Sequence, residues 1–60
     1  MIKIENKNNI KLSDLKLLIE KCEESKIPDN TEIHIHQIGN RTSRAKEILA
    51  DDSSIDIYDF

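Results

Sequence analysis

The sequence contains very few of the residues that crosslink or interrupt a small fold. Its 60 residues include one cysteine, one proline, one glycine and no tryptophan. Because Cys22 is the only cysteine, an intramolecular disulfide is excluded, and a free thiol is typical of a reducing compartment, so we expect a cytoplasmic protein. A free cysteine inside a helical pattern is usually a small buried apolar residue. A single glycine excludes a glycine-rich phosphate-binding loop.

Long apolar runs are also missing. No stretch approaches the ~18 to 20 residues that cross a bilayer, and the first residues lack the apolar core of a signal peptide. We therefore expect neither membrane insertion nor secretion by that route. A chain of this length holds one hydrophobic core, so residues 1–60 are expected to form a single domain. Because so small a core gives little stability, we expect the domain to be stabilised further by oligomerisation or by a partner.

The charge is mildly acidic, with nine basic and twelve acidic residues and a net charge of −3. This balance argues against non-specific binding to the phosphates of nucleic acid. The last ten residues contain four aspartates and no lysine or arginine, which suggests an acidic C-terminal pole. If the protein acts by binding a partner protein, one hypothesis is that this pole mimics DNA and occupies a basic channel of the partner.

One pattern, Ile-x-Ile, recurs at residues 2–4, 33–35 and 55–57. Alternation of apolar and polar residues predicts strands with one buried face. The strongest of the three is the stretch at residues 32–38. Residues 10–12 alternate once more, so they either pair with the first strand in a hairpin or lead directly into a helix.

Two helices are expected. Ser13 is a suitable N-cap, and the first helix should run to about Ser25 or Lys26, because Pro28 disfavours helical conformation in the residue before it. Its apolar side recurs at helical spacing, with the residues Leu15, Leu18, Ile19 and Cys22. A short second helix is predicted from Thr42 or Ser43 to about Ala50, with the apolar side Ala45, Ile48 and Leu49.

These elements predict an α+β domain. We expect a three- or four-stranded sheet with two helices packed on one face, in the order β(β)αβαβ. The opposite face of the sheet would then be open, and strand parity places on it five residues that are suited to partner binding: His34, His36, Ile38, Tyr58 and Phe60. The alternative is that Ile38 turns back into the core and the two aromatic residues fray at the end of the chain.

Other candidate sites are less complete. His34 and His36 would project side by side, but two imidazoles do not make a metal site, so no metal or other cofactor is expected. Arg41 and Arg44 flank the start of the predicted second helix, where an anion or an acidic surface could dock. No spacing of serine, Cys22 and histidine matches a nucleophilic triad, so we do not expect an enzyme.

Residues 11–35 open with Lys-Leu-Ser-Asp-Leu and continue through Ile-Pro-Asp-Asn-Thr-Glu-Ile. This helix–turn–strand segment resembles small uncharacterised proteins of bacteriophages and prophages. The resemblance implies a short, acidic, non-enzymatic protein that binds a host protein stoichiometrically, as an inhibitor of a host enzyme or of a defence system such as a nuclease. Two alternatives stay open: a structural or self-assembling homodimer, and an anion or nucleic-acid binder that uses Arg41 and Arg44.

Overall fold

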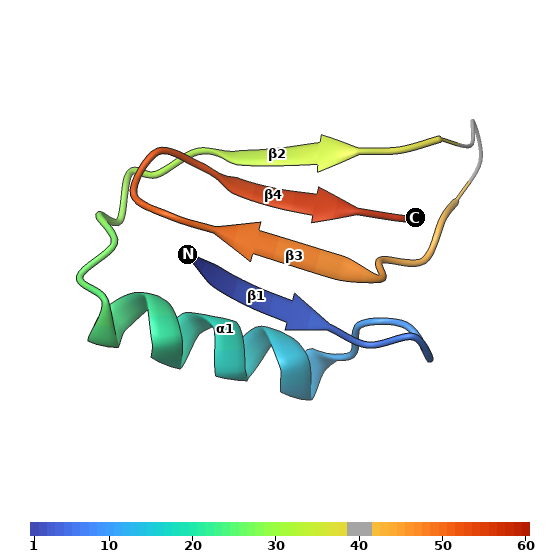
Figure 1. Ribbon diagram of the computed structural model, residues 1–60, viewed down its shortest axis with the longest axis horizontal. Coiled ribbons are helices and arrows are strands. Elements are labelled where there is room, and N and C mark those ends of the chain that lie inside the picture. The colour runs from blue at the N-terminus through green and yellow to red at the C-terminus, as the bar shows by residue number, and fades with distance from the viewer. Residues whose placement is uncertain (39–41) are drawn as a thin grey trace.

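The computed structural model describes residues 1–38 and 42–60 and shows a small α+β fold. Its elements are β1 (Ile2–Glu5), α1 (Leu12–Glu24), β2 (Ile33–His36), β3 (Glu47–Ala50) and β4 (Ile55–Tyr58). The four strands form one sheet in the order β1-β3-β4-β2 (Figure 1). The β1/β3 and β3/β4 pairs are antiparallel, and β2 and β4 are parallel.

The α+β class and the four-stranded sheet are as predicted, but the predicted second helix is wrong. The segment 47–50 is strand β3, and α1 is the only helix in the described part of the chain. Ile48 pairs with Ile4 on one side and with Ile57 on the other. Long-range pairing with two strands therefore outweighs the local helix preference of this segment.

The order β(β)αβαβ is corrected to βαβββ. Ile10 does not belong to a strand; its N–H donates to the carbonyl of Ala45 at 2.7 Å, which ties the lead-in of the helix to the start of β3. The stretch at residues 32–38, predicted as the strongest strand, forms β2 over Ile33–His36, and this strand lies at an edge of the sheet. The fourth strand comes from the segment that the sequence assigned to a helix.

The N-cap of helix α1 lies two residues earlier than expected, and the capping side chain comes from inside the helix. Lys11 rather than Ser13 is the N-cap residue. The carboxylate of Asp14 accepts a hydrogen bond from the backbone N–H of Lys11 at 2.9 Å and another from the Asn6 amide at 3.1 Å. These bonds, the one from Lys11 first, lower the pKa of Asp14. An ionised carboxylate in the first turn also interacts favourably with the helix dipole.

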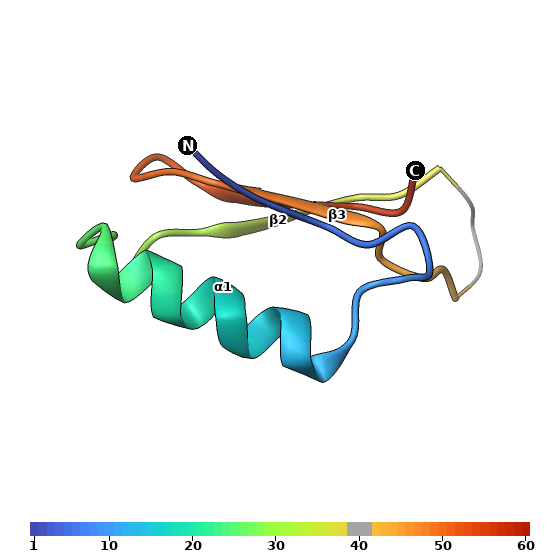
Figure 2. The same cartoon turned by 60° about the horizontal axis from the view of Figure 1, so that its bottom comes forward.

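The helix lies against one face of the sheet (Figure 2). Leu18 is its one buried residue and packs with Ile4, Ile48 and Ala50. This core lies over β1 and β3, the half of the sheet on which α1 rests. The β2 half of the same face is left without a covering helix, because the segment predicted to cover it has joined the sheet.

Candidate protein-binding face

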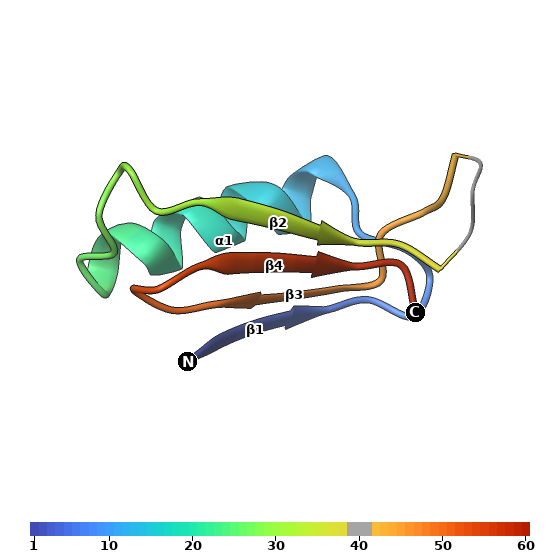
Figure 3. The same cartoon turned by 90° about the horizontal axis from the view of Figure 1, so that it is seen from above.

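The face of the sheet opposite α1 is open, as the sequence predicted. Strand pairing aligns Lys3, Leu49, Asp56 and His34 in one row across this face, and Glu5, Glu47, Tyr58 and His36 in the next. The β1 end is charged: Lys3 lies 3.5 Å from Glu47 and 3.8 Å from Glu5. The β4 and β2 end, where the two strands run side by side (Figure 3), carries the histidines and the aromatic side chains.

Three of the predicted residues form one aromatic cluster, which consists of His36, Tyr58 and Phe60. The His36 and Tyr58 rings are stacked, with centroids 4.4 Å apart and an interplanar angle of 13°. The Tyr58 and Phe60 rings meet edge to face, with centroids 5.4 Å apart and an angle of 82°. Both arrangements are favourable for aromatic rings. Phe60 is nevertheless 61 % exposed, so the cluster presents apolar area to solvent.

A carboxylate holds the two histidines in place. Asp56 Oδ1 lies 2.8 Å from His36 Nε2 and 3.5 Å from His34 Nδ1, and Asp56 Oδ2 accepts a hydrogen bond from the Ser54 hydroxyl at 2.8 Å. The hydrogen bond with His36, followed by that from Ser54, lowers the pKa of Asp56. His34 Nε2 also lies 3.2 Å from Glu32. The imidazoles are therefore engaged with acidic groups of their own chain.

Ile38 belongs to the same end of the sheet. Its backbone N–H donates to both carboxylate oxygens of Asp59, at 3.1 and 3.3 Å, which fixes the chain after β2 beside the chain after β4. The side chain of Ile38 is 74 % exposed. The alternative in which Ile38 returns to the core is therefore wrong. The structure places all five predicted residues at this end of the sheet, with His36, Tyr58 and Phe60 in direct contact.

The predicted anion site loses its structural basis. Arg41 lies outside the described residues. Arg44 is exposed and borders a shallow polar hollow together with Lys46 and Asn9, but it precedes a strand rather than a helix. The N-terminal N–H groups and the helix dipole that favoured an anion there are consequently missing from the described part of this segment.

The acidic C-terminal pole is also corrected. Asp51 lies in the turn between β3 and β4, where it accepts hydrogen bonds from the backbone N–H groups of Ser53 and Ser54. Asp56 lies within β4, and Asp59 lies beyond the other end of that strand. The acidic groups are therefore distributed along the strand, and those nearest the aromatic cluster are Asp56 and Asp59.

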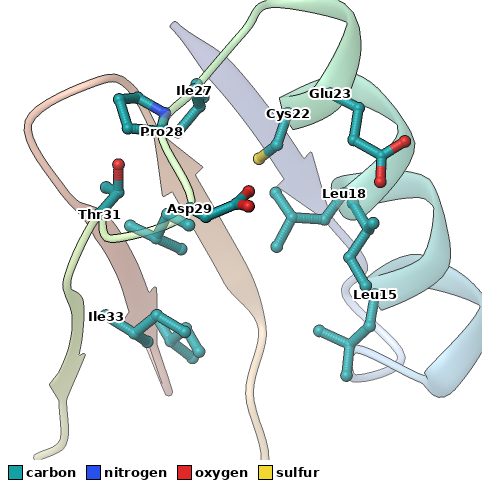
Figure 4. A pocket seen from close by; sticks show the side chains of 12 residues that line it. Leu15, Leu18, Cys22, Glu23, Ile27, Pro28, Asp29, Thr31 and Ile33 are labelled. Carbon is teal, nitrogen blue, oxygen red and sulfur yellow. The ribbon is translucent and has the colours of Figure 1, made fainter.

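Sequence reasoning missed a second surface, on the helix side of the sheet. An apolar groove of about 340 Å³ lies between α1 and the β2 half of the sheet. Leu15, Leu18 and Cys22 point into it from the helix, and Ile33 points into it from β2 (Figure 4). Burial raises the pKa of the Cys22 thiol, in keeping with its predicted role as an apolar residue. The sequence feature that pointed to this groove was the number of apolar residues on α1, which is larger than the core alone needs.

Comparison of the chain with protein-family models, with curated proteins and with solved structures found no match. Within residues 1–38 and 42–60, no helix has the length and apolar character needed to cross a bilayer. No group of three histidine, cysteine, aspartate or glutamate side chains in these same residues is arranged to hold a metal ion. The geometry of the open face therefore carries the functional argument alone.

Proposed function

We propose that this chain is a non-enzymatic, cytoplasmic protein-binding protein whose open sheet face docks on a basic, arginine-bearing surface of its partner. The observation that carries the proposal is the aromatic cluster, with Tyr58 stacked on His36 and Phe60 exposed at its edge. Exposed aromatic side chains bury large areas at low cost in side-chain entropy, and they are enriched among the residues that dominate binding energy.

The charges around the cluster favour a basic partner. Glu32 and Asp56 lie beside the two histidines at this end of the sheet, and Asp59 borders the hollow that Arg44 and Lys46 also line. An arginine side chain can stack on an aromatic ring and reach a carboxylate with the same guanidinium group. We further propose that the partner is a host protein of a bacteriophage or prophage, and that the outcome of binding is stoichiometric inhibition.

The test compares wild-type protein with the double variant Tyr58→Ala/Phe60→Ala. A partner captured from a bacterial lysate is purified and titrated with both proteins by calorimetry. We expect a one-to-one complex with wild type and an affinity at least about thirtyfold weaker for the variant, since truncation of aromatic anchors costs ~2 kcal/mol or more. Circular dichroism establishes that the variant is folded.

Leu17→Ala is the matched control, because Leu17 is a partly exposed apolar residue on α1, on the other side of the sheet. Its affinity should equal that of the wild type. Equal affinity of the double variant would remove the open face from the binding site. Binding that does not weaken as salt is raised would contradict the basic character of the partner surface.

A further inference from the structure

The two edges of the sheet are protected to different degrees. The edge strand β1 carries Lys3 and Glu5, which form an ion pair, and charged side chains disfavour pairing with a further strand. The other edge strand, β2, has the sequence Ile-His-Ile-His, without lysine, proline or a bulge. Among residues 1–38 and 42–60, no other segment lies outside β2 (Figure 1). An apolar edge of this kind is suited to the addition of another strand.

The backbone of β2 shows which residues face the open edge. The carbonyls of Glu32 and His36 accept hydrogen bonds from Ile55 and Asp59, at 2.9 and 3.3 Å, so they point toward β4. Alternate peptide groups of a strand point to opposite sides. The N–H and C=O groups of Ile33 and Ile35 therefore point away from β4, toward the open edge.

We propose that β2 pairs antiparallel with β2 of a second copy of this chain, about a two-fold axis at His34. This register places Ile33 opposite Ile35 of the second copy, and the edge-facing peptide groups of these two residues form the hydrogen-bonded pair. His34 faces its own equivalent in a pair without hydrogen bonds. By the two-fold symmetry each contact occurs twice, as in other isologous interfaces.

Neighbouring registers are less complementary. An axis at Ile33 would place Ile35 opposite Thr31, and an axis at Ile35 would place Ile33 opposite Gln37. Only the axis at His34 pairs both isoleucines with isoleucines, and it also places Glu32 opposite His36 of the second copy. Apolar cross-strand pairs stabilise a sheet, and a carboxylate can accept a hydrogen bond from an imidazole.

The exposed isoleucines of β2 and the small core of the domain explain why pairing is favourable. Ile33 is 61 % exposed and Ile35 is 73 % exposed, whereas the central-strand residue Ile48 is fully buried. In the part of the chain that the structure describes, four buried residues form the core, which is little for a chain of this size. Pairing brings the four β2 isoleucines of the two copies together on the helix side. The proposal does not rest on the proposed function, because the edge is distinct from the open face.

The geometry permits this arrangement. An axis perpendicular to the sheet keeps both copies of α1 on one face, and each helix rests on the half of its own sheet that is remote from β2. The result is a continuous eight-stranded sheet. Both aromatic clusters then lie on the other face, on either side of the paired His34 residues.

The register is tested by disulfide trapping in a Cys22→Ala background. Facing residues of a pair without hydrogen bonds have Cα atoms about 4.5 Å apart, which is within the range for a disulfide. The variant His34→Cys should therefore form a covalent dimer under mild oxidation. Leu49→Cys, on the same face but two strands from the edge, should remain monomeric, since its equivalents would lie roughly 24 Å apart at ~4.8 Å per strand.

Sedimentation of the chain without added cysteine gives the second measurement. We expect a dimer for wild type. For Ile33→Lys/Ile35→Lys we expect the dissociation constant of the dimer to be at least about tenfold higher, because charge at an edge opposes pairing. Both residues are exposed, so this variant should stay folded. Three outcomes would overturn the proposal. The wild-type chain could stay monomeric at high concentration, both cysteine variants could form covalent dimers to the same extent, or His34→Cys could form a disulfide only with another protein.

Discussion

His36 and Asp56 connect the two parallel strands through one short contact, with Nε2 of His36 2.8 Å from Oδ1 of Asp56. This contact lowers the pKa of Asp56 below its ordinary value of 3.8. A carboxylate with a lowered pKa stabilises the folded state above its unfolded pKa, and this contribution is lost as the pH falls through the folded-state pKa. Asp56 should therefore contribute to acid sensitivity below about pH 3.8.

The variant Asp56→Asn tests this expectation. It should be less stable than wild type at about pH 5, and the difference should shrink as the pH falls below 3.8, because the wild-type carboxyl becomes protonated as well. Urea unfolding at several pH values measures both free energies. Asp52→Asn is the control at an exposed turn position and should show little difference at either pH. A difference for Asp56→Asn that is constant with pH would show that the carboxylate charge does not matter.

Ile48 is the residue on which the core depends most. It is 0 % exposed and lies between Ile4 and Ile57 at the centre of the sheet. Ile48→Ala should lower the free energy of unfolding by about 2 to 5 kcal/mol, which for so small a domain approaches the whole stability. Ile38→Ala removes the same atoms from an exposed site and should change it by less than about 0.5 kcal/mol. Thermal unfolding monitored by circular dichroism distinguishes the two variants.

The backbone at the end of α1 is strained at Lys26, and a substitution can relieve this strain. Lys26 follows the C-cap residue with φ of 57°, and the N–H groups of Lys26 and Ile27 donate back to the carbonyls of Glu23 and Cys22. Glycine adopts this left-handed conformation without the steric cost of a Cβ atom. Lys26→Gly should therefore raise the free energy of unfolding by about 0.5 to 1 kcal/mol.

Lys16→Gly is the appropriate comparison, since it makes the same chemical change in the middle of α1. There glycine should lower the free energy of unfolding by about 1 kcal/mol. Denaturant titration of both variants gives the two values. Destabilisation by Lys26→Gly would show that the lysine side chain contributes more than its backbone conformation costs.

The groove between α1 and β2 should bind apolar dyes in the native state. Ile19 lines it and is exposed, so Ile19→Ser removes apolar area with little loss of packing. We expect the fluorescence of a bound naphthalene sulfonate dye to fall at least about twofold, as the apolar contact area is reduced. Leu17→Ser, outside the groove, should leave the fluorescence unchanged. Equal loss for both variants would place the dye elsewhere.

Local patterns predicted the elements whose periodicity is unambiguous. The three Ile-x-Ile segments are strands, and the stretch from Leu15 to Cys22 is helical. Alternation also assigned the faces correctly: Ile4 is buried beneath the helix, and Tyr58 lies on the open side. These assignments succeeded because the period of a strand or helix determines the side of each residue, whatever the strand order.

The segment after residue 42 shows the limit of such patterns. Ala45, Ile48 and Leu49 have the spacing of a helix, whereas Ile48 and Ala50 have the alternation of a strand, and so short a stretch fits both. Pairing with β1 and β4, which are remote in sequence, decides in favour of the strand. The groove was missed for the same reason, because it lies where the expected second helix would have packed.

The order of the strands in the sheet has a consequence for synthesis on the ribosome. The two outer strands, β1 and β2, emerge first, and the two inner strands that join them, β3 and β4, emerge last. The strand β1 gains its neighbour when β3 leaves the exit tunnel, whereas β2 has no neighbour until β4 follows. The pairing of β1 with β3 can therefore precede the rest of the sheet, and β2 should join the fold only after β4 has left the ribosome.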